Sequence, residues 1–394
     1  MENLYWIYLV LSNIEHEIRN TILMKCDVIV TYCWNRVGYN IIRSLFEKGL
    51  NVVVGDTSKH NICSMSRYSV GSFTYSDPTT DENAFISDIK AAIQKYNPKV
   101  LMPTHDEALV LAKHVEELPQ DVIYIMEDYE MQVKLSDKYS ATVLAEKAGV
   151  PVPAFIQDLQ GHDYPIVVKT KFGNSAKGVY FPKSYDEAMK IISNYKREDL
   201  LIEEFFPGVD YSVDCVRYDG FFFASTYRSL VTKTDGGGTT TQRVIVSMPS
   251  IEHYAEKLLN EVDYKGVCGI DFKVNEETGE AAFIEVNARF TGGLATPMAA
   301  GFDIPYIVYS LFTSGKYEQP INLKVGTKTK WILGDVIALV SKIVQRTLTK
   351  KEFKQIRSWD FDAFDDFRKD DKRAILGECR YYLNKLIKNK KLNP

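Results

Sequence analysis

The sequence predicts a mixed α/β and α+β protein, with an open parallel α/β domain first and antiparallel sheets after it. Three observations support this fold class. Apolar strands alternate with amphipathic helices between residues 26 and 125, as βαβ units of a parallel sheet require. Two alternating runs, 266–274 and 281–290, flank a turn of hairpin length, which is typical of antiparallel pairing. A small glycine-bearing turn at 172–180 joins two further strands.

Composition and charge narrow the class of protein. The chain has 394 residues, 45% hydrophobic and 25% charged, which suits a globular protein of two or three domains. Its formal net charge of −4 lacks the basic footprint of a protein bound to nucleic acid or to an anionic membrane, so we expect neither partner. The 6 cysteines form no C-x-x-C pair, which indicates reduced thiols and a cytoplasmic location.

Residues 1–24 are interpreted as an N-terminal extension, either native or the result of an upstream start. Their apolar run, 4–11, is too short to span a bilayer and has no basic leader of the kind that precedes a signal peptide.

The first domain begins with strand 26–32, helix 36–48 and strand 50–55, which together form a βαβ unit. Helices at 85–96 and 106–117 and strands at 99–103 and 121–125 complete it. Its first turn lacks two of the three glycines of a dinucleotide site, which disfavours a nicotinamide oxidoreductase. Ligands of such sheets lie at the carboxyl ends of the strands. Asp106 lies there and is interpreted as favouring the positive end of its helix, whereas Glu107 is left open as a domain-junction contact.

The hairpin at 266–290 carries the clearest chemical signal. Strand alternation places Glu285, Asn287 and Arg289 on one face. Pairing that is symmetric about Thr278 puts Asp271 opposite Glu285, which is unfavourable unless a cation lies between the two carboxylates. Oxygen ligands of this kind suit Mg²⁺. On this stretch alone, a solvated hairpin with its polar face outward is an equal alternative.

Upstream residues suggest where an anion binds. Lys138 lies in the first turn of a helix that Ser136 or Asp137 caps, a position that is unfavourable for a cation unless an anion is near. Lys169 follows an apolar strand and needs an anionic partner. The turn 172–180 suits backbone closure over phosphates, with an ordinary hairpin turn as the alternative. The strand end at 203–206 offers a hinge and carboxylates for adenine and ribose.

The remaining segments carry weaker signals. Segment 233–243, with three consecutive glycines, is interpreted as a mobile lid or a surface loop. Helices are expected at 301–311 (after Pro305) and at 373–388, and one or two strands at 331–340. The acidic and aromatic stretch 359–366 receives no chemical role.

Taken in order, these features resemble the ATP-grasp superfamily, particularly its carbamoyl-phosphate synthetase and biotin-carboxylase-like branch. The most specific part is I-E-V-N-A-R at 284–289 with Asp271 upstream, and the resemblance spans about residues 26–315. It implies a Rossmann-like pre-ATP-grasp domain at 25–126 and a two-lobed ATP-grasp domain at 127–320, whose small lobe is about 150–205. Residues 321–394 would complete the module with strands and a helix.

The resemblance also implies ATP and Mg²⁺, or Mn²⁺ in its place, as cofactors. The implied phosphate-binding residues are Lys138, Lys169, Lys171, Gly173, Ser175, Lys177 and Gly178. Adenine would lie against Glu203, Glu204, Phe205 and Phe206, and the ribose against Asp210. Asp271, Glu285 and Asn287 would bind the metal, and Arg289 with Lys169 would act in catalysis.

The implied reaction is phosphoryl transfer from ATP to a carboxylate, followed by attack of an amine on the acyl phosphate. We therefore expect a carboxylate–amine ligase acting on small molecules, and leave open whether it is a homodimer. An ATP-grasp carboxylase, a carbamoyl-phosphate-type synthetase and an ATP-binding regulatory protein are the alternatives. Two departures from the family pattern stand out. Asp271 and Asp210 replace the usual Glu, and the segment 290–293 does not match a biotin-carboxylase acceptor site.

Overall fold

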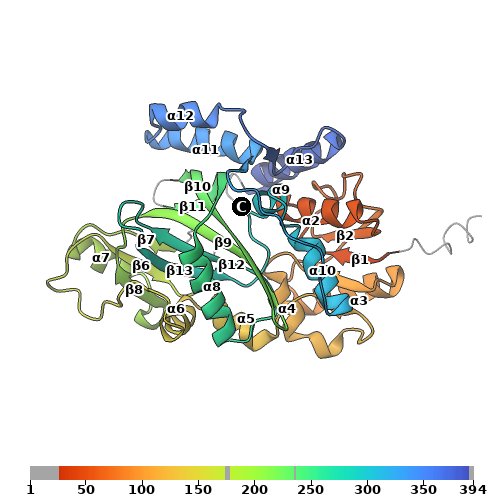
Figure 1. Ribbon diagram of the computed structural model, residues 1–394, viewed down its shortest axis with the longest axis horizontal. Coiled ribbons are helices and arrows are strands. Elements are labelled where there is room, and N and C mark those ends of the chain that lie inside the picture. Colours follow the sequence, from red (N-terminus) through yellow and green to blue (C-terminus); the bar gives the residue numbers. More distant parts are fainter. Residues whose placement is uncertain (1–25, 174–177, 235–236, 390–394) are drawn as a thin grey trace, which may run out of the picture.

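A computed structural model describes residues 26–173, 178–234 and 237–389, and its strands form three sheets (Figure 1). A five-stranded parallel sheet lies at one side, a seven-stranded sheet at the centre and a three-stranded sheet at the other side. The mixture of parallel and antiparallel sheets is the fold class that the sequence predicts. Within the described ranges, no helix combines the length and apolar content that a bilayer crossing needs.

The N-terminal sheet has the order β3-β2-β1-β4-β5. Its strands are β1 (Val28–Val30), β2 (Val52–Asp56), β3 (Gly71–Thr74), β4 (Val100–Met102) and β5 (Ile123–Tyr124). Its helices are α2 (Arg36–Glu47), α3 (Glu82–Tyr96) and α4 (Glu107–Lys113), with a short 3₁₀ helix at Val115–Glu117. The sequence missed β3, because G-S-F-T is short and half exposed. Strands β1 and β4 are neighbours from which the chain continues to opposite sides, so their carboxyl ends mark the position where open α/β sheets usually bind ligands.

Helices α5 (Tyr129–Ser136) and α6 (Lys138–Lys147) lead out of this sheet. The predicted helix start is confirmed, because the Asp137 carboxylate accepts hydrogen bonds from the backbone N–H groups of Tyr139 and Ser140. This cap fixes Lys138 as the first residue of α6, which packs against the central sheet.

The three-stranded sheet, of order β7-β6-β8, forms a small lobe. It consists of β6 (Ile166–Thr170), β7 (Val179–Tyr180) and β8 (Leu200–Glu204), with α7 (Tyr185–Ile192) and a 3₁₀ helix at Arg197–Asp199. Its separate small core includes Ile166, Val168 and Ile202. Both partners of β6 are antiparallel to it, so the glycine-bearing turn does join two strands, as the sequence indicated.

The central sheet has the order β13-β12-β9-β10-β11-β14-β15. Its strands are β9 (Val209–Tyr218), β10 (Phe221–Thr234), β11 (Gly237–Val246), β12 (Gly266–Val274), β13 (Ala281–Asn287), β14 (Lys328–Lys330) and β15 (Ala363–Phe364). Helices α8 (Pro249–Glu261), α9 (Ala295–Ala299) and α10 (Ile304–Ser314) connect and cover it. The lid prediction for 233–243 was wrong for the described part, which is a long β10–β11 hairpin. The β-branched residues 239–241 and 244–246 outweigh the neighbouring glycines.

The C-terminal part holds the second correction. Residues 331–340 are not strands but belong largely to α11 (Ile332–Gln345), which is followed by α12 (Lys350–Ile356) and by the predicted last helix, α13 (Lys372–Asn389). The run is rich in β-branched residues, but Asp366 accepts hydrogen bonds from the N–H groups of Ile332 and Leu333 at its start. A distant residue therefore caps α11, and local sequence does not reveal such a cap.

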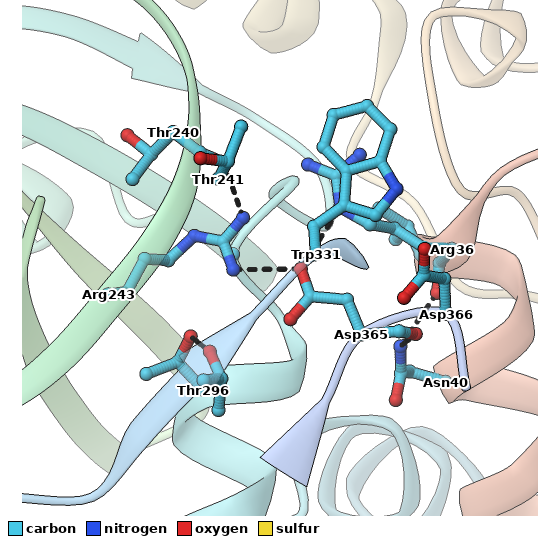
Figure 2. Close-up of polar contacts among 12 residues, drawn as sticks. Arg36, Asn40, Thr240, Thr241, Arg243, Thr296, Trp331, Asp365 and Asp366 are labelled. Atoms are coloured by element: carbon cyan, nitrogen blue, oxygen red, sulfur yellow. Dashed lines mark hydrogen bonds and ion pairs between the residues drawn. The ribbon is translucent and has the colours of Figure 1, made fainter. Parts of the chain in front are cut away.

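A buried ionic junction joins helix α2, strand β11 of the central sheet and the segment that follows β15 (Figure 2). Asp365, which follows β15, accepts from Arg36 Nε at 3.1 Å and from Arg243 Nη1 at 2.8 Å through the same oxygen. Its backbone carbonyl accepts from Asn40 Nδ2, and the Arg36 guanidinium lies 3.8 Å from the centre of the Trp331 ring. The stretch that received no chemical role thus ties α2 to the central sheet.

Candidate functional site

The β12–β13 hairpin forms the floor of the site. Asp271 pairs directly with Glu285, which confirms the predicted register, and a bulge follows between Asp271 and Phe272. Burial, and then the charge of Glu285, raise the pKa of Asp271 to about 7. Without a cation between them, the two carboxylates therefore cannot both ionise easily at neutral pH.

Three neighbouring groups compensate for this pair. The Ser212 hydroxyl and Asn287 Nδ2 donate hydrogen bonds to the two oxygens of Asp271, Asn287 at 3.2 Å. Lys138 Nζ lies 3.3 Å from Glu285 Oε2 and also donates to the carbonyl of Gly173 at 2.6 Å. The three predicted metal ligands and Lys138 therefore meet at one place, below the glycine-bearing turn.

The donor set fits a hard divalent ion such as Mg²⁺. Two carboxylates and an amide provide oxygen ligands. Because the pKa of Asp271 is about 7, an ion could displace its proton near neutral pH. In the described residues, no three His, Cys, Asp or Glu side chains gather around a common point. A metal here would need phosphate oxygens or water in addition, which is how Mg²⁺ is usually held beside a nucleotide.

Lys169 connects the small lobe to the same floor. Its Nζ lies 2.8 Å from Glu203 Oε2 and donates to the carbonyl of Ile284 in β13 at 3.3 Å. Both charged residues are buried, and burial raises the pKa of Glu203 although Lys169 opposes the shift. The anionic partner that the sequence demanded for Lys169 is thus Glu203, one oxygen of which has no hydrogen bond.

The structure describes the two ends of the glycine-bearing turn, Gly173 and Gly178. At Gly178 only a glycine fits. Gly178 has a φ of +74°, and a Cβ there would lie 2.4 Å from Thr170 Oγ1. Gly173 also has a positive φ, and its carbonyl binds Lys138. Ser175 and Lys177, the remaining predicted residues of this turn, lie outside the described residues. Lys171 places its ammonium 5.3 Å from the centre of the Tyr139 ring.

The predicted adenine hinge lies at the end of β8. Glu204 and Phe205 are exposed, Phe206 is half-buried, and Phe205 packs edge-to-face on Phe181 at a centroid distance of 6.0 Å. Glu203 points instead to Lys169, and Asp210 forms an ion pair with Lys273 at 2.7 Å. The hinge therefore offers exposed aromatic surface with a carboxylate beside it.

Arg289 reaches the carboxyl-end side of the N-terminal sheet. Its Nε lies 3.0 Å from Asp106 Oδ1, beside His105, whose ring stacks on Tyr32. Burial opposes ionisation of Asp106, but its contacts with His105 and Arg289 hold the Asp106 pKa below its ordinary value. Asp106 lies at the start of α4, as its interpretation as a helix-end charge requires, but its side chain makes no cap hydrogen bond and also contacts Arg289.

Glu107 is not the junction contact. It is buried inside the N-terminal domain, where one oxygen accepts from the Thr31 hydroxyl at 2.7 Å and from the N–H of Thr104 at 2.9 Å. Burial raises the pKa of Glu107 to about 7. Adjacent acids at a helix start give no sequence signal of which one faces inward.

Three sheets, two lysines that contact a carboxylate-lined hairpin, and a glycine-bearing turn are the features that the chain has in common with ATP-grasp proteins. A family model described as "ATP-grasp in the biosynthetic pathway with Ter operon" matches residues 196–334. The chain is 27% identical over 228 residues to a D-alanine--D-alanine ligase of Acetivibrio thermocellus, a match that covers 48% of this chain and 59% of the relative. It is 22% identical over 367 residues to the N-terminal section of the carbamoyl phosphate synthase large chain of Methanopyrus kandleri, covering 83% and 60%.

Solved structures agree on the fold. The biotin carboxylase domain of Hydrogenobacter thermophilus 2-oxoglutarate carboxylase, solved with MgADP and bicarbonate, has a TM-score of 0.62 at 16% identity, covering 77% of this chain and 74% of that one. An L-amino acid ligase from Bacillus licheniformis has a TM-score of 0.60 at 15% identity, covering 74% and 75%. The chain therefore shares the fold of these structures, and its residues 196–334 match an ATP-grasp family model. It spans about 60% of the length of the two curated relatives named above.

Proposed function

We propose that the protein is an ATP- and Mg²⁺-dependent ligase that activates a small-molecule carboxylate as an acyl phosphate, which an amine then attacks with release of ADP and phosphate. The observation that carries this proposal is the position of Lys138. Its ammonium contacts Glu285 of the predicted metal site and Gly173 of the predicted phosphate turn at once. A charge that bridges these two sites suits a nucleotide phosphate bound between them.

Each residue of the site has a distinct role in this proposal. Asp271, Glu285 and Asn287 would hold Mg²⁺, which when bound supplies charge neutralisation on the transferring phosphoryl group. Lys138 and Lys169 would orient the phosphates, and the Gly173–Gly178 turn would exclude water from them. Glu203 keeps Lys169 extended toward β13. The aromatic hinge at Phe205 and the carboxylates of Glu204 and Asp210 would receive adenine and ribose.

Arg289 would bind the carboxylate that is activated. It lies two residues beyond the end of β13, which carries Glu285 and Asn287, and its Nε reaches Asp106 at the start of α4. In the substrate-free chain it contacts Asp106, which a substrate carboxylate could replace. The acceptor amine would then approach from the side on which Tyr32 and His105 stack.

A second candidate function is an ATP-grasp carboxylase or a carbamoyl-phosphate-type synthetase. The match to the carbamoyl phosphate synthase section favours it, since it covers 83% of this chain. The ligase remains first, because the segment after Arg289 runs Phe290-Thr291-Gly292-Gly293 and departs from the biotin-carboxylase pattern.

A panel of amino acids and other carboxylates, each assayed for ADP release with Mg²⁺ and a set of amines, tests the proposal. We expect ADP to form only when a particular acid and a particular amine are both present. Release that depends on bicarbonate alone would assign the carboxylase reaction, and release of AMP would indicate adenylation. Nucleotide binding without turnover across the panel would favour a regulatory protein.

We further propose a cytoplasmic location, which the free thiols of Cys26, Cys33, Cys63, Cys215, Cys268 and Cys379 support. Sedimentation of the purified chain would decide between a monomer and a homodimer.

A further inference from the structure

Helix α11 buries its charged side chains and exposes several aliphatic ones. Its two charged residues face the protein: Asp335 is 3% exposed and pairs with Lys330 at 3.0 Å, and Lys342 pairs with Glu352 at 2.8 Å. Four of its aliphatic residues face outward, with Val336 53%, Val340 48%, Ile343 56% and Val344 75% exposed. A surface helix normally shows the reverse arrangement.

The four exposed side chains form one continuous stripe, because their spacing of four, three and one residues keeps them on one side of the helix. The following helix, α12, adds Phe353, which is 40% exposed. Figure 1 shows α11 and α12 together along one outer edge of the molecule. Continuous exposed apolar surface of this kind marks an interaction site.

Most of the charged residues that follow the stripe in the sequence are cations. Exposed cations follow it at Arg346, Lys350, Lys351, Lys354 and Arg357. The acid among them, Glu352, already binds Lys342 and the start of α12. An aliphatic stripe beside lysines and arginines is the pattern of a helix that lies on an anionic lipid surface.

A second copy of the chain fits this surface poorly. A two-fold contact through α11 would bring the two sets of cations together, and four aliphatic side chains supply far less than the roughly 800 Å² per partner of a stable interface. A protein partner is also disfavoured, because three of the five cations beside the stripe are lysines, which are depleted in protein interfaces.

We propose that the α11–α12 surface, formed by Val336, Val340, Ile343, Val344 and Phe353 with the cations between residues 346 and 357, docks on an anionic phospholipid surface. This contrasts with the expectation of no membrane partner, which rested on the net charge of −4 for the whole chain. An average over the chain hides a local basic patch beside exposed aliphatic side chains.

Co-sedimentation of the full chain with vesicles tests the proposal. One set is phosphatidylcholine alone, and the other is phosphatidylcholine and phosphatidylglycerol at a ratio of roughly 7 to 3. We expect binding to the anionic vesicles only, weakened by salt. The pair Val340→Glu and Val344→Glu should lower the binding constant by about tenfold or more, and so should Lys350→Glu with Lys354→Glu.

Two matched controls separate the patch from general effects. Val325→Glu alters an equally exposed valine outside the patch, and Lys99→Glu with Lys316→Glu makes the same charge change elsewhere. Both should bind as the wild type does, and thermal unfolding should be alike in all variants. Absence of binding to anionic vesicles would overturn the proposal. So would equal losses in the controls, or a concentration-dependent dimer that Val344→Glu dissociates.

Discussion

Asp271 and Glu285 show how two residues set the chemistry of the site. Placed opposite each other on neighbouring strands, they repel, and the Asp271 pKa rises to about 7 as a result of burial and that repulsion. A divalent ion that replaces the proton would satisfy both carboxylates at once. Under the proposed function, the hairpin would thus be more favourable with a metal bound than without one, which suits a site that recruits a metal together with its nucleotide.

Replacing Glu285 by Gln should separate catalysis from folding. We expect Glu285→Gln to lower ADP release by about two orders of magnitude, because an amide cannot neutralise the metal as a carboxylate does. Loss of one of two repelling charges should leave the free energy of unfolding within about 1 kcal/mol of the wild type. Urea unfolding and an ADP assay check this. Glu277→Gln, an exposed acid in the same hairpin, serves as the control, and wild-type turnover in Glu285→Gln would refute the metal role.

Glu107 gives a prediction of pH dependence. Burial raises its pKa from 4.5 to about 7 in the folded chain. Between these values the folded state holds a proton that the unfolded state has lost, so stability falls as the pH rises from about 4.5 to 7. Glu107→Gln removes this proton uptake. We therefore expect the variant to gain stability relative to the wild type between pH 5 and pH 8, by on the order of 2 kcal/mol.

Urea midpoints at the two pH values measure this difference. Glu116→Gln, which changes an exposed acid at the end of the same segment, should show no such gain. A pH-independent difference between Glu107→Gln and the wild type would mean that Glu107 is ionised in the folded chain throughout.

At the scale of elements, the sequence predicted the helices and strands whose start, end and pairing depend on their own residues. The β12–β13 register follows from alternation and a central turn, and α6 follows from Asp137 and its apolar stripe. Helix α11 escaped prediction, since its cap comes from Asp366 and its polar residues face inward. The β10–β11 hairpin escaped because glycines suggested a loop, whereas pairing with β9 and β14 stabilises the strands.

The candidate site divides in the same way. Asp271, Glu285 and Asn287 could be predicted to meet because they lie on one hairpin, and the structure brings them together. Pairings between distant segments, such as Arg289 with Asp106 or Arg36 with Asp365, have no local signature. They depend on how sheets pack, which a single sequence does not encode in its periodicity.

The Asp365 junction yields a prediction at the scale of elements. Asp365→Asn keeps the size of the side chain but leaves two buried guanidinium groups, Arg36 and Arg243, without their carboxylate. We expect a loss of about 3 kcal/mol in the free energy of unfolding, as for other buried ion pairs that lose one partner. Asp360→Asn, an exposed acid five residues earlier, should change stability by less than about 0.5 kcal/mol. Equal urea midpoints for the two variants would show that the junction does not hold the elements together.

At the scale of the whole molecule, the site exists only where the three sheets meet. Lys138 and Lys169 connect the small-lobe side to β13, and Arg289 connects β13 to the N-terminal sheet. These contacts converge on β13 and the residues just after it, so under the proposed function a shift of either outer sheet would move a phosphate-binding or an acid-binding group.

The Arg289–Asp106 contact allows this arrangement to be tested. If Arg289 binds the substrate carboxylate, Arg289→Lys should lower turnover by about two orders of magnitude, because lysine loses the paired donors of a guanidinium. Asp106→Asn should change turnover by less than about tenfold and act mainly on the KM of the carboxylate, since Asp106 only occupies Arg289 before substrate arrives. Arg217→Lys, at an ion pair with Asp263 away from the site, controls for general effects of the exchange. If Asp106→Asn lowers kcat as strongly as Arg289→Lys, turnover depends on the intact ion pair between the two sheets. Binding of the carboxylate by Arg289 alone would then be refuted.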